Sequence, residues 1–209
     1  MYGVFGNLLQ LVYIWNNICY LFTDGRQFTV YNKEQILQES EKARYIDCRL
    51  NAYPIFSESE SELVSPTIIF IDIDGDSKKL MNSILKRTLK KIRSKLKAYL
   101  PTVLWTGNGY HLYVVLDTTA LELMPKLTEL CSEPSKLFHK FAESYLTNGM
   151  NDLNHNPTFK SCLLRIPGTL NSKCLSHNVD AEVKIIRRFQ EAVPLIDRIL
   201  SQDITSSKG

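Results

Sequence analysis

The sequence lacks several features that would assign it to a specialised class of protein. It has no C-x-x-C pair, no visible internal repeat and no charged side chain before Asp24. Its five cysteines form an odd set without closely spaced pairs, which favours reduced thiols in the cytoplasm over a secreted disulfide framework. With 44% hydrophobic and 22% charged residues, the composition is that of a soluble globular protein, which excludes a disordered or fibrous chain.

Residues 1–23 carry no charged side chain and include the apolar stretch LLQLVYIW. A signal peptide would need a basic start and a small-residue cleavage site, and a membrane helix would need about 20 uninterrupted apolar residues. The stretch is interrupted by Asn7, Gln10, Asn16 and Asn17. We therefore expect a helix packed into the core, and no membrane partner.

Hydrophobic periodicity and turn residues predict both strands and helices along the rest of the chain. A hairpin is expected over 20–31, and a helix from Asn32, its N-cap, to about Arg44. The further expected strands are 45–54, 67–74, 102–106, 110–116, CLLRIP and EVKIIRRF, and the further expected helices are the one capped by Ser77, 120–131, 134–147 and 194–200. Because strict β-α-β alternation is absent, the predicted fold class is α+β, with a mainly antiparallel sheet flanked by helices.

The length of 209 residues suits one catalytic unit with a small appendage. The acidic loop SESESE, residues 57–62, separates the two parts. We expect residues 1–65 to form a small N-terminal α/β part, residues 66–200 the catalytic core, and residues 201–209 a disordered tail.

The heptapeptide FIDIDGD, residues 70–76, places three aspartates at the end of an apolar strand. Side chains alternate along a strand, so Asp72 and Asp74 share one face while the neighbouring isoleucines share the other. Two carboxylates on one face raise each other's pKa and destabilise the strand unless a cation neutralises them. Their hard oxygen atoms favour Mg²⁺ or Mn²⁺. The alternative is an acidic turn that caps the basic helix after it.

A second polar stretch, WTGNGYHLYVVL, covers residues 105–116. Its glycines, Gly107 and Gly109, permit a tight turn and a close backbone approach. His111 begins a strand and shares a face with Tyr113. Beside two carboxylates this histidine could contact a phosphate, and a purely structural histidine is the alternative.

A third stretch, LLRIPGTLNSK, covers residues 163–173 and suits the binding of an anion. Arg165 offers a planar fork for phosphate, Lys173 a point charge, and the Pro-Gly-Thr turn offers backbone donors. A plain strand and turn with two solvated cations is the alternative.

The three stretches, in this order, resemble the archaeo-eukaryotic primase superfamily, and within it the compact primase-polymerases (PrimPols) of archaeal plasmids and other mobile elements. Asp72 and Asp74 match the D-x-D motif, Gly109-Tyr110-His111 matches the small-residue-x-His motif, and residues 165–173 match the R-L-P-G-S/T-x-x-x-K motif. The resemblance spans roughly residues 45–190 and implies an archaeo-eukaryotic primase core whose sheet is of the RRM type.

The resemblance also implies the site residues. The third carboxylate of the family lies about a dozen residues before the arginine, which points to Asp152, with Asp180 as the substitute. Asp72, Asp74 and Asp152 would hold two Mg²⁺ or Mn²⁺ ions. The incoming triphosphate would be bound by His111, Arg165, Asn171 and Lys173.

The activity implied is that of a DNA primase, a template-dependent nucleotidyltransferase. It would form phosphodiester bonds from NTPs or dNTPs on single-stranded DNA, with a separately encoded helicase as a candidate partner.

Residues 77–99 contain nine Lys or Arg and no Asp or Glu, so the helix expected there has a basic face. Its cations Lys86, Arg87, Lys90 and Lys91 could follow a DNA backbone. A solvated helix exterior is the alternative.

Three other functions fit the sequence less well. In a haloacid-dehalogenase-type phosphatase, which also has an apolar strand and D-x-D-G, Asp72 would be the nucleophile, but a late acidic pair is missing. A non-catalytic nucleic-acid-binding replication module would have no reason to bear the repulsion between clustered carboxylates. A rolling-circle nicking enzyme would need a His-apolar-His motif, which is absent.

A zinc site is a weaker candidate. Its ligands would be His155, Cys162, Cys174 and His177, of which only the last two form a closely spaced pair.

Overall fold

The computed structural model describes residues 19–52, 68–95, 101–115, 134–151, 162–175, 177 and 180–187. These residues form two four-stranded sheets in which all the paired strands are antiparallel. Mixed α/β structure built on antiparallel sheets agrees with the predicted fold class, although there are two sheets where the sequence predicted one main sheet.

The first sheet has the strand order β2-β1-β3-β7. Its strands are β1 (Cys19–Thr23), β2 (Arg26–Val30), β3 (Arg49–Asn51) and β7 (Leu163–Arg165). Helix α2 (Lys33–Lys42) follows β2, and the side chain of Asn32 accepts a hydrogen bond from the Gln35 backbone N–H at 2.9 Å, as an N-cap does. Because β7 completes a sheet begun by β1 to β3, the first sheet crosses the expected boundary between residues 65 and 66.

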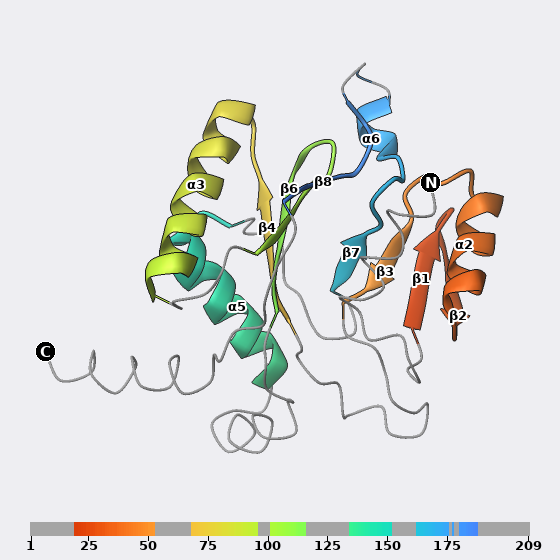
Figure 1. Ribbon diagram of the computed structural model, residues 1–209, viewed down its shortest axis with the longest axis horizontal. Helices are drawn as coiled ribbons and strands as arrows, with labels where there is room; N and C mark the ends of the chain where they lie inside the picture. The colour runs from red at the N-terminus through yellow and green to blue at the C-terminus, as the bar shows by residue number, and fades with distance from the viewer. Residues whose placement is uncertain are drawn as a thin grey trace, which may run out of the picture.

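The second sheet has the order β4-β6-β5-β8. Its strands are β4 (Ile68–Asp74), β5 (Thr102–Trp105), β6 (Gly109–Val115) and β8 (Lys184–Arg187). One face is covered by α3 (Lys78–Lys95) and α5 (Pro134–Thr147), while the first sheet and α2 lie on the other side (Figure 1). The short helix α6 (Ser172–Leu175), which the sequence did not predict, follows β7.

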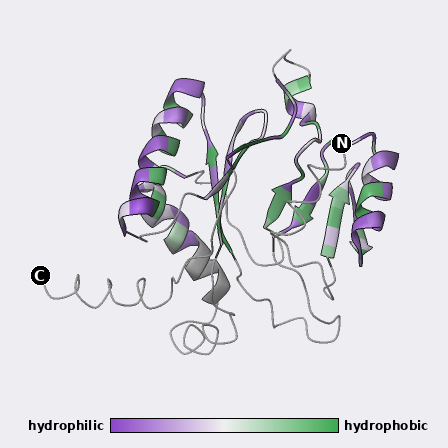
Figure 2. Cartoon of the chain, viewed as in Figure 1, coloured by the Kyte–Doolittle hydropathy of each residue, from purple (hydrophilic) through white to green (hydrophobic). Residues whose placement is uncertain are grey.

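Strand β4 divides its side chains between two hydrophobic clusters. Ile69, Ile71 and Ile73 pack with residues of α3 and α5. Ile68 and Phe70 pack with residues of the first sheet. In Figure 2 the hydrophobic colour, green, runs along β4, and α3 is mixed green and purple. The face that carries Phe70 is therefore the face that looks toward the first sheet.

The segment 166–171, which follows β7, is hydrogen-bonded to both halves of the molecule. The Gly168 N–H donates to Val183 O at 2.8 Å, just before β8 of the second sheet. The Leu170 N–H donates to Tyr45 O, also at 2.8 Å, just before β3 of the first sheet. These bonds fix the two sheets relative to each other.

The structure confirms the predicted hairpin and the strands and helices around it, with ends shifted by a few residues. The helix expected at LLQLVYIW lies outside the described residues, while residues 19–23 form β1, the first strand of the predicted hairpin. The helices expected over 120–131 and 194–200 and the tail 201–209 lie outside the described residues. No helix among the described residues has the length and apolar character needed to cross a membrane.

Candidate active site

Asp72 and Asp74 lie at the end of β4, on the face directed toward the first sheet. They are paired in register with His111 and Gly109 of the neighbouring strand β6. The His111 Nε2 atom lies 3.6 Å from Asp72 Oδ1. The pairing of β4 with β6 therefore brings the D-x-D and G-x-H stretches together.

Gly109 makes room for the second aspartate. A Cβ atom built at Gly109 would overlap both Asp74 Oδ1 and the carbonyl oxygen of Ile73. The absence of a side chain at this position therefore lets the Asp74 carboxylate lie across β6 at the edge of the site.

The ring of His111 is held by aromatic neighbours. Its Nδ1 atom lies 3.3 Å from the Tyr113 hydroxyl, and the Phe70 ring meets it edge-on with centroids 4.9 Å apart. Burial, reinforced by nearby Cys162 and Asp72, raises the pKa of Tyr113 well above its ordinary value. The phenol therefore stays neutral and fixes the orientation of the imidazole.

A carboxylate from α5 closes the open edge of β4 at the same position. Glu143 is 1% exposed, and its Oε1 atom accepts a hydrogen bond from the Asp72 backbone N–H at 3.0 Å. Among the strands that the structure describes, β4 lies at the edge of its sheet, and the buried carboxylate accepts the hydrogen bond of this N–H. The sequence did not single out Glu143, since a glutamate within an amphipathic helix usually faces solvent.

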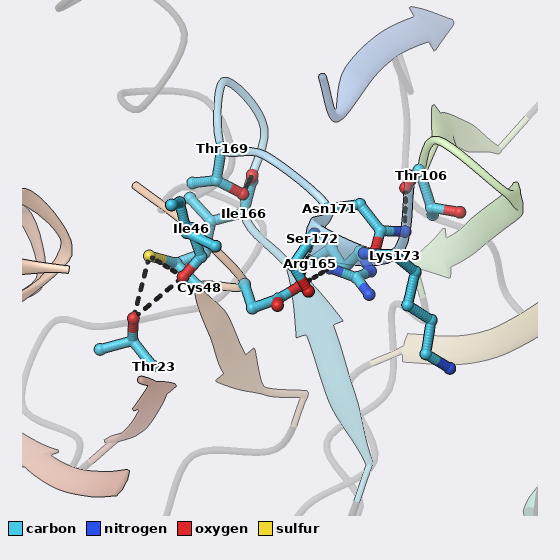
Figure 3. Close-up of polar contacts among 11 residues, drawn as sticks. Thr23, Ile46, Cys48, Thr106, Arg165, Ile166, Thr169, Asn171, Ser172 and Lys173 are labelled. Atoms are coloured by element: carbon cyan, nitrogen blue, oxygen red, sulfur yellow. Dashed lines mark hydrogen bonds and ion pairs between the residues drawn. The ribbon is translucent and has the colours of Figure 1, made fainter. Parts of the chain in front are cut away.

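Arg165, at the end of β7, is anchored by Asp47. Its Nη1 atom donates to Asp47 Oδ1 at 3.0 Å, and the Ser172 backbone N–H donates to the same oxygen at 3.2 Å. Partial burial alone would raise the pKa of Asp47, but the hydrogen bonds from Ser172 and Arg165 outweigh it and lower the pKa. Figure 3 shows Arg165 and Ser172 close together in this network. Asp47 was not recognised in the sequence.

Asn171 links the arginine segment to the turn before His111. Its side chain is 2% exposed: Nδ2 donates to Thr106 O at 2.8 Å, and Oδ1 accepts from the Lys173 backbone N–H at 3.3 Å (Figure 3). Thr106 Oγ1 in turn accepts from the Gly109 N–H at 3.0 Å. Lys173 is exposed on α6. Both ends of the Asn171 amide thus contact protein groups.

The carboxylates of β4 suit a divalent cation. They are hard oxygen donors two positions apart on one face, and Gly109 leaves room for the second. Asp152 lies outside the described residues, and within the described ranges no three His, Cys, Asp or Glu side chains gather into a metal-binding group. Asp180 is exposed, and both of its carboxylate oxygens accept from Lys184 Nζ at 2.8 Å.

The four candidate zinc ligands do not share one environment. His155 lies outside the described residues, and His177 is exposed. Cys162 is buried, and burial, with Glu143 and Asp72 nearby, raises its pKa well above the ordinary value. Cys174 lies beside Gly107. Both cysteines carry free thiols, as do Cys19 and Cys48.

The four basic residues of α3 that were predicted to follow a DNA backbone differ in their contacts. Lys86, Arg87 and Lys90 are exposed, and Lys91 is partly buried. Arg87 and Lys91 contact the end of α5: Arg87 Nη2 lies 3.1 Å from the sulfur of Met150, and Lys91 Nζ donates to Tyr145 O and, at 2.7 Å, to Asn148 Oδ1.

No protein-family model matches the chain, and no curated protein does. Among solved structures, the chain is similar to the AEP domain of the primase-polymerase (PrimPol) of cyanophage S-2L. The identity is 13% and the TM-score 0.59, over 93% of this chain and 94% of that one. At this identity the likeness establishes the fold, a mixed α/β fold of the AEP type. The archaeal-plasmid type stays a prediction.

Replacing Gly109 with alanine should destabilise the fold by about 1–3 kcal/mol, because the new Cβ would overlap backbone as well as Asp74. Gly75→Ala is the matched control, since its Cβ would meet the flexible Met81 side chain at 3.3 Å. Urea denaturation measures both variants. If both variants lose the same free energy of unfolding, the steric role of Gly109 is contradicted.

Glu143→Ala should lower the free energy of unfolding by about 1–3 kcal/mol, since it leaves a buried backbone N–H without its acceptor. Glu143→Gln keeps an acceptor oxygen at this place, so its free energy of unfolding should fall clearly less. Denaturation of both variants at pH 7 tests the hydrogen bond, and similar losses would show that the acceptor is unimportant.

Asp47→Asn should lower the melting temperature at pH 7, with the difference from wild type shrinking as the pH falls below the ordinary pKa of an aspartate. The reason is that the folded-state pKa of Asp47 is lowered, so its ionised form stabilises the fold above the ordinary pKa, and this contribution is lost as pH falls through the folded value. Asp24→Asn, in the exposed β1–β2 turn, is the control. A difference that stays constant across this pH range would refute the assignment.

Proposed function

We propose that this chain is a primase-polymerase, a template-dependent nucleotidyltransferase that joins NTPs or dNTPs on single-stranded DNA. The observation that carries the proposal is the placement of Asp72, Asp74 and His111 on one face of the second sheet, facing the arginine-bearing first sheet. The fold shared with a primase-polymerase domain supports it. Nucleotide transfer needs carboxylates to hold the metal ions and a cation to bind the triphosphate. Neither a carboxylate pair nor an arginine alone would therefore support this proposal.

The carboxylates of β4 are the proposed metal ligands, with Asp152 as the third. Mg²⁺ or Mn²⁺, when bound, would supply charge that lowers the pKa of the attacking hydroxyl and stabilises the departing pyrophosphate. Asn151, directly before Asp152, bonds through Oδ1 to the hydroxyls of Ser144 and Thr147 on α5. The same helix contacts Asp72, and this continuity favours Asp152 over Asp180.

Arg165, His111 and Lys173 are the proposed triphosphate ligands. A guanidinium has five N–H donors, and Asp47 holds that of Arg165 through Nη1, which fixes the plane of the fork before a ligand arrives. His111 lies beside Asp72, so it can reach a phosphate close to the carboxylates. Asn171 would act by positioning, since it ties Lys173 to the β5–β6 turn.

The proposed DNA contacts are on α3. Lys86 and Lys90 are exposed and suit contacts to a template backbone, whereas Arg87 and Lys91 also contact α5. A separate helicase remains a proposed partner. The phosphatase alternative has less support, because it accounts for neither the histidine opposite Asp72 nor the shared fold.

Asp72→Asn should reduce nucleotide incorporation by about a thousandfold, since it removes a charge from the proposed cation site. The assay uses single-stranded DNA, Mg²⁺ or Mn²⁺, and labelled dNTPs or NTPs, with and without a primer. Asp24→Asn, the same change in an exposed turn, should be fully active.

If Asp72→Asn still extends strands, the site is misassigned. If the wild-type chain binds DNA but incorporates no nucleotide under any of these conditions, the chain is a non-catalytic module. Release of phosphate from a monophosphate ester, without strand extension, would favour the phosphatase.

A further inference from the structure

A second arginine lies next to Arg165 on the first sheet. Arg49 of β3 is the direct antiparallel partner of Arg165 in β7. Side chains of opposed residues lie on the same face, with Cβ atoms about 4.5–5.5 Å apart. The alternate positions, Leu50 and Leu164, are paired with each other and enter the hydrophobic core. The two guanidinium groups therefore share the other face of this sheet.

The charge of Arg49 interacts with carboxylates of both sheets. Burial lowers its pKa, and the charge of Arg165 lowers it further, while the carboxylates of Asp47 and Asp72 act in the opposite direction. Asp72 belongs to the second sheet, so Arg49 lies within electrostatic reach of both sheets. An arginine stays protonated in such a place, because a guanidinium is not deprotonated in proteins.

Two like charges directly opposite each other destabilise a sheet. Asp47 forms an ion pair with Arg165 at 3.0 Å and also accepts from Ser172. Among the residues that the structure describes, the Arg49 side chain forms neither an ion pair nor a hydrogen bond. A half-buried guanidinium beside a second one is therefore a place where an anion would be stabilised.

We propose that Arg49 binds the triphosphate of the incoming nucleotide together with Arg165, and that the nucleotide is thus held by both strands of this pair. The inference rests on the proposed function. Two planar forks side by side match a chain of phosphates better than an isolated phosphate, because each can take its own pair of oxygens. Their position opposite Asp72 puts that chain beside the proposed metal ligands.

The test compares Arg49→Gln with wild type in two measurements. The first is the KM for the nucleotide during strand extension, which should rise about tenfold or more with a smaller change in kcat. The second uses inorganic tripolyphosphate, whose protection of the chain against thermal unfolding should weaken in the variant. Arg49→Lys keeps the charge but not the planar fork. Its KM and its protection by tripolyphosphate should therefore lie between those of wild type and those of Arg49→Gln.

Arg26→Gln is the matched control, since Arg26 is exposed on β2 of the same sheet. It should leave the KM and the protection unchanged. Without ligand, Arg49→Gln should melt no lower than wild type, because it removes a repulsion. A lower melting temperature with an unchanged KM would give Arg49 a structural role and overturn the proposal.

Two further outcomes separate the alternatives. If Arg49→Gln weakens single-stranded DNA binding while the KM for the nucleotide is unchanged, Arg49 contacts the template and the proposal fails. If the wild-type chain incorporates no nucleotide, the primase-polymerase proposal fails by itself, whereas a loss of tripolyphosphate protection in Arg49→Gln still supports the anion site.

Discussion

The hydrogen bonds that join segment 166–171 to both sheets determine where the charged groups of this molecule lie. Arg165 precedes the segment directly, and Asn171, at its end, holds the turn that leads to His111. Backbone bonds at Gly168 and Leu170 connect the segment to the second and the first sheet respectively. Together with the hydrophobic core that the two sheets share, these bonds set the distance between the arginines of one sheet and the aspartates of the other.

This arrangement concentrates unfavourable contacts in one place. Asp72 and Asp74 share a face of β4, and Arg49 opposes Arg165 on the first sheet. Each pair is repulsive alone, but the two pairs have opposite signs and belong to facing sheets. Asp47 relieves one arginine. The remaining repulsion is understandable if cations and a polyanion bind between the sheets, since each ligand would neutralise the pair nearest to it.

Local patterns predicted a large part of the fold and which candidate site residues share a strand face. Alternation predicted that Asp72 and Asp74 share one face of β4 and that His111 and Tyr113 share one face of β6. The register between these strands, which pairs Asp72 with His111, then decided that the two faces coincide. Asp47 and Arg49 were missed, because Asp47 lies in a bend before β3, with a φ of 49°, and nothing in the stretch IDCR indicates a relation to Arg165. Glu143 was also missed. Its hydrogen bond to Asp72 joins residues 71 positions apart, and nothing in a helix pattern indicates such a contact.

The sequence by itself determined which residues form strands, where the hairpin turns, and which charges share a strand face, since these depend on neighbours within a few positions. The tertiary structure decided that β7 joins the first sheet, that Arg49 lies against Arg165, and that a buried glutamate closes the edge of β4. The physical reason is that register and edge pairing depend on residues more than a hundred positions apart in the case of β3 and β7, and their free energy is realised only when both sheets pack on a common core.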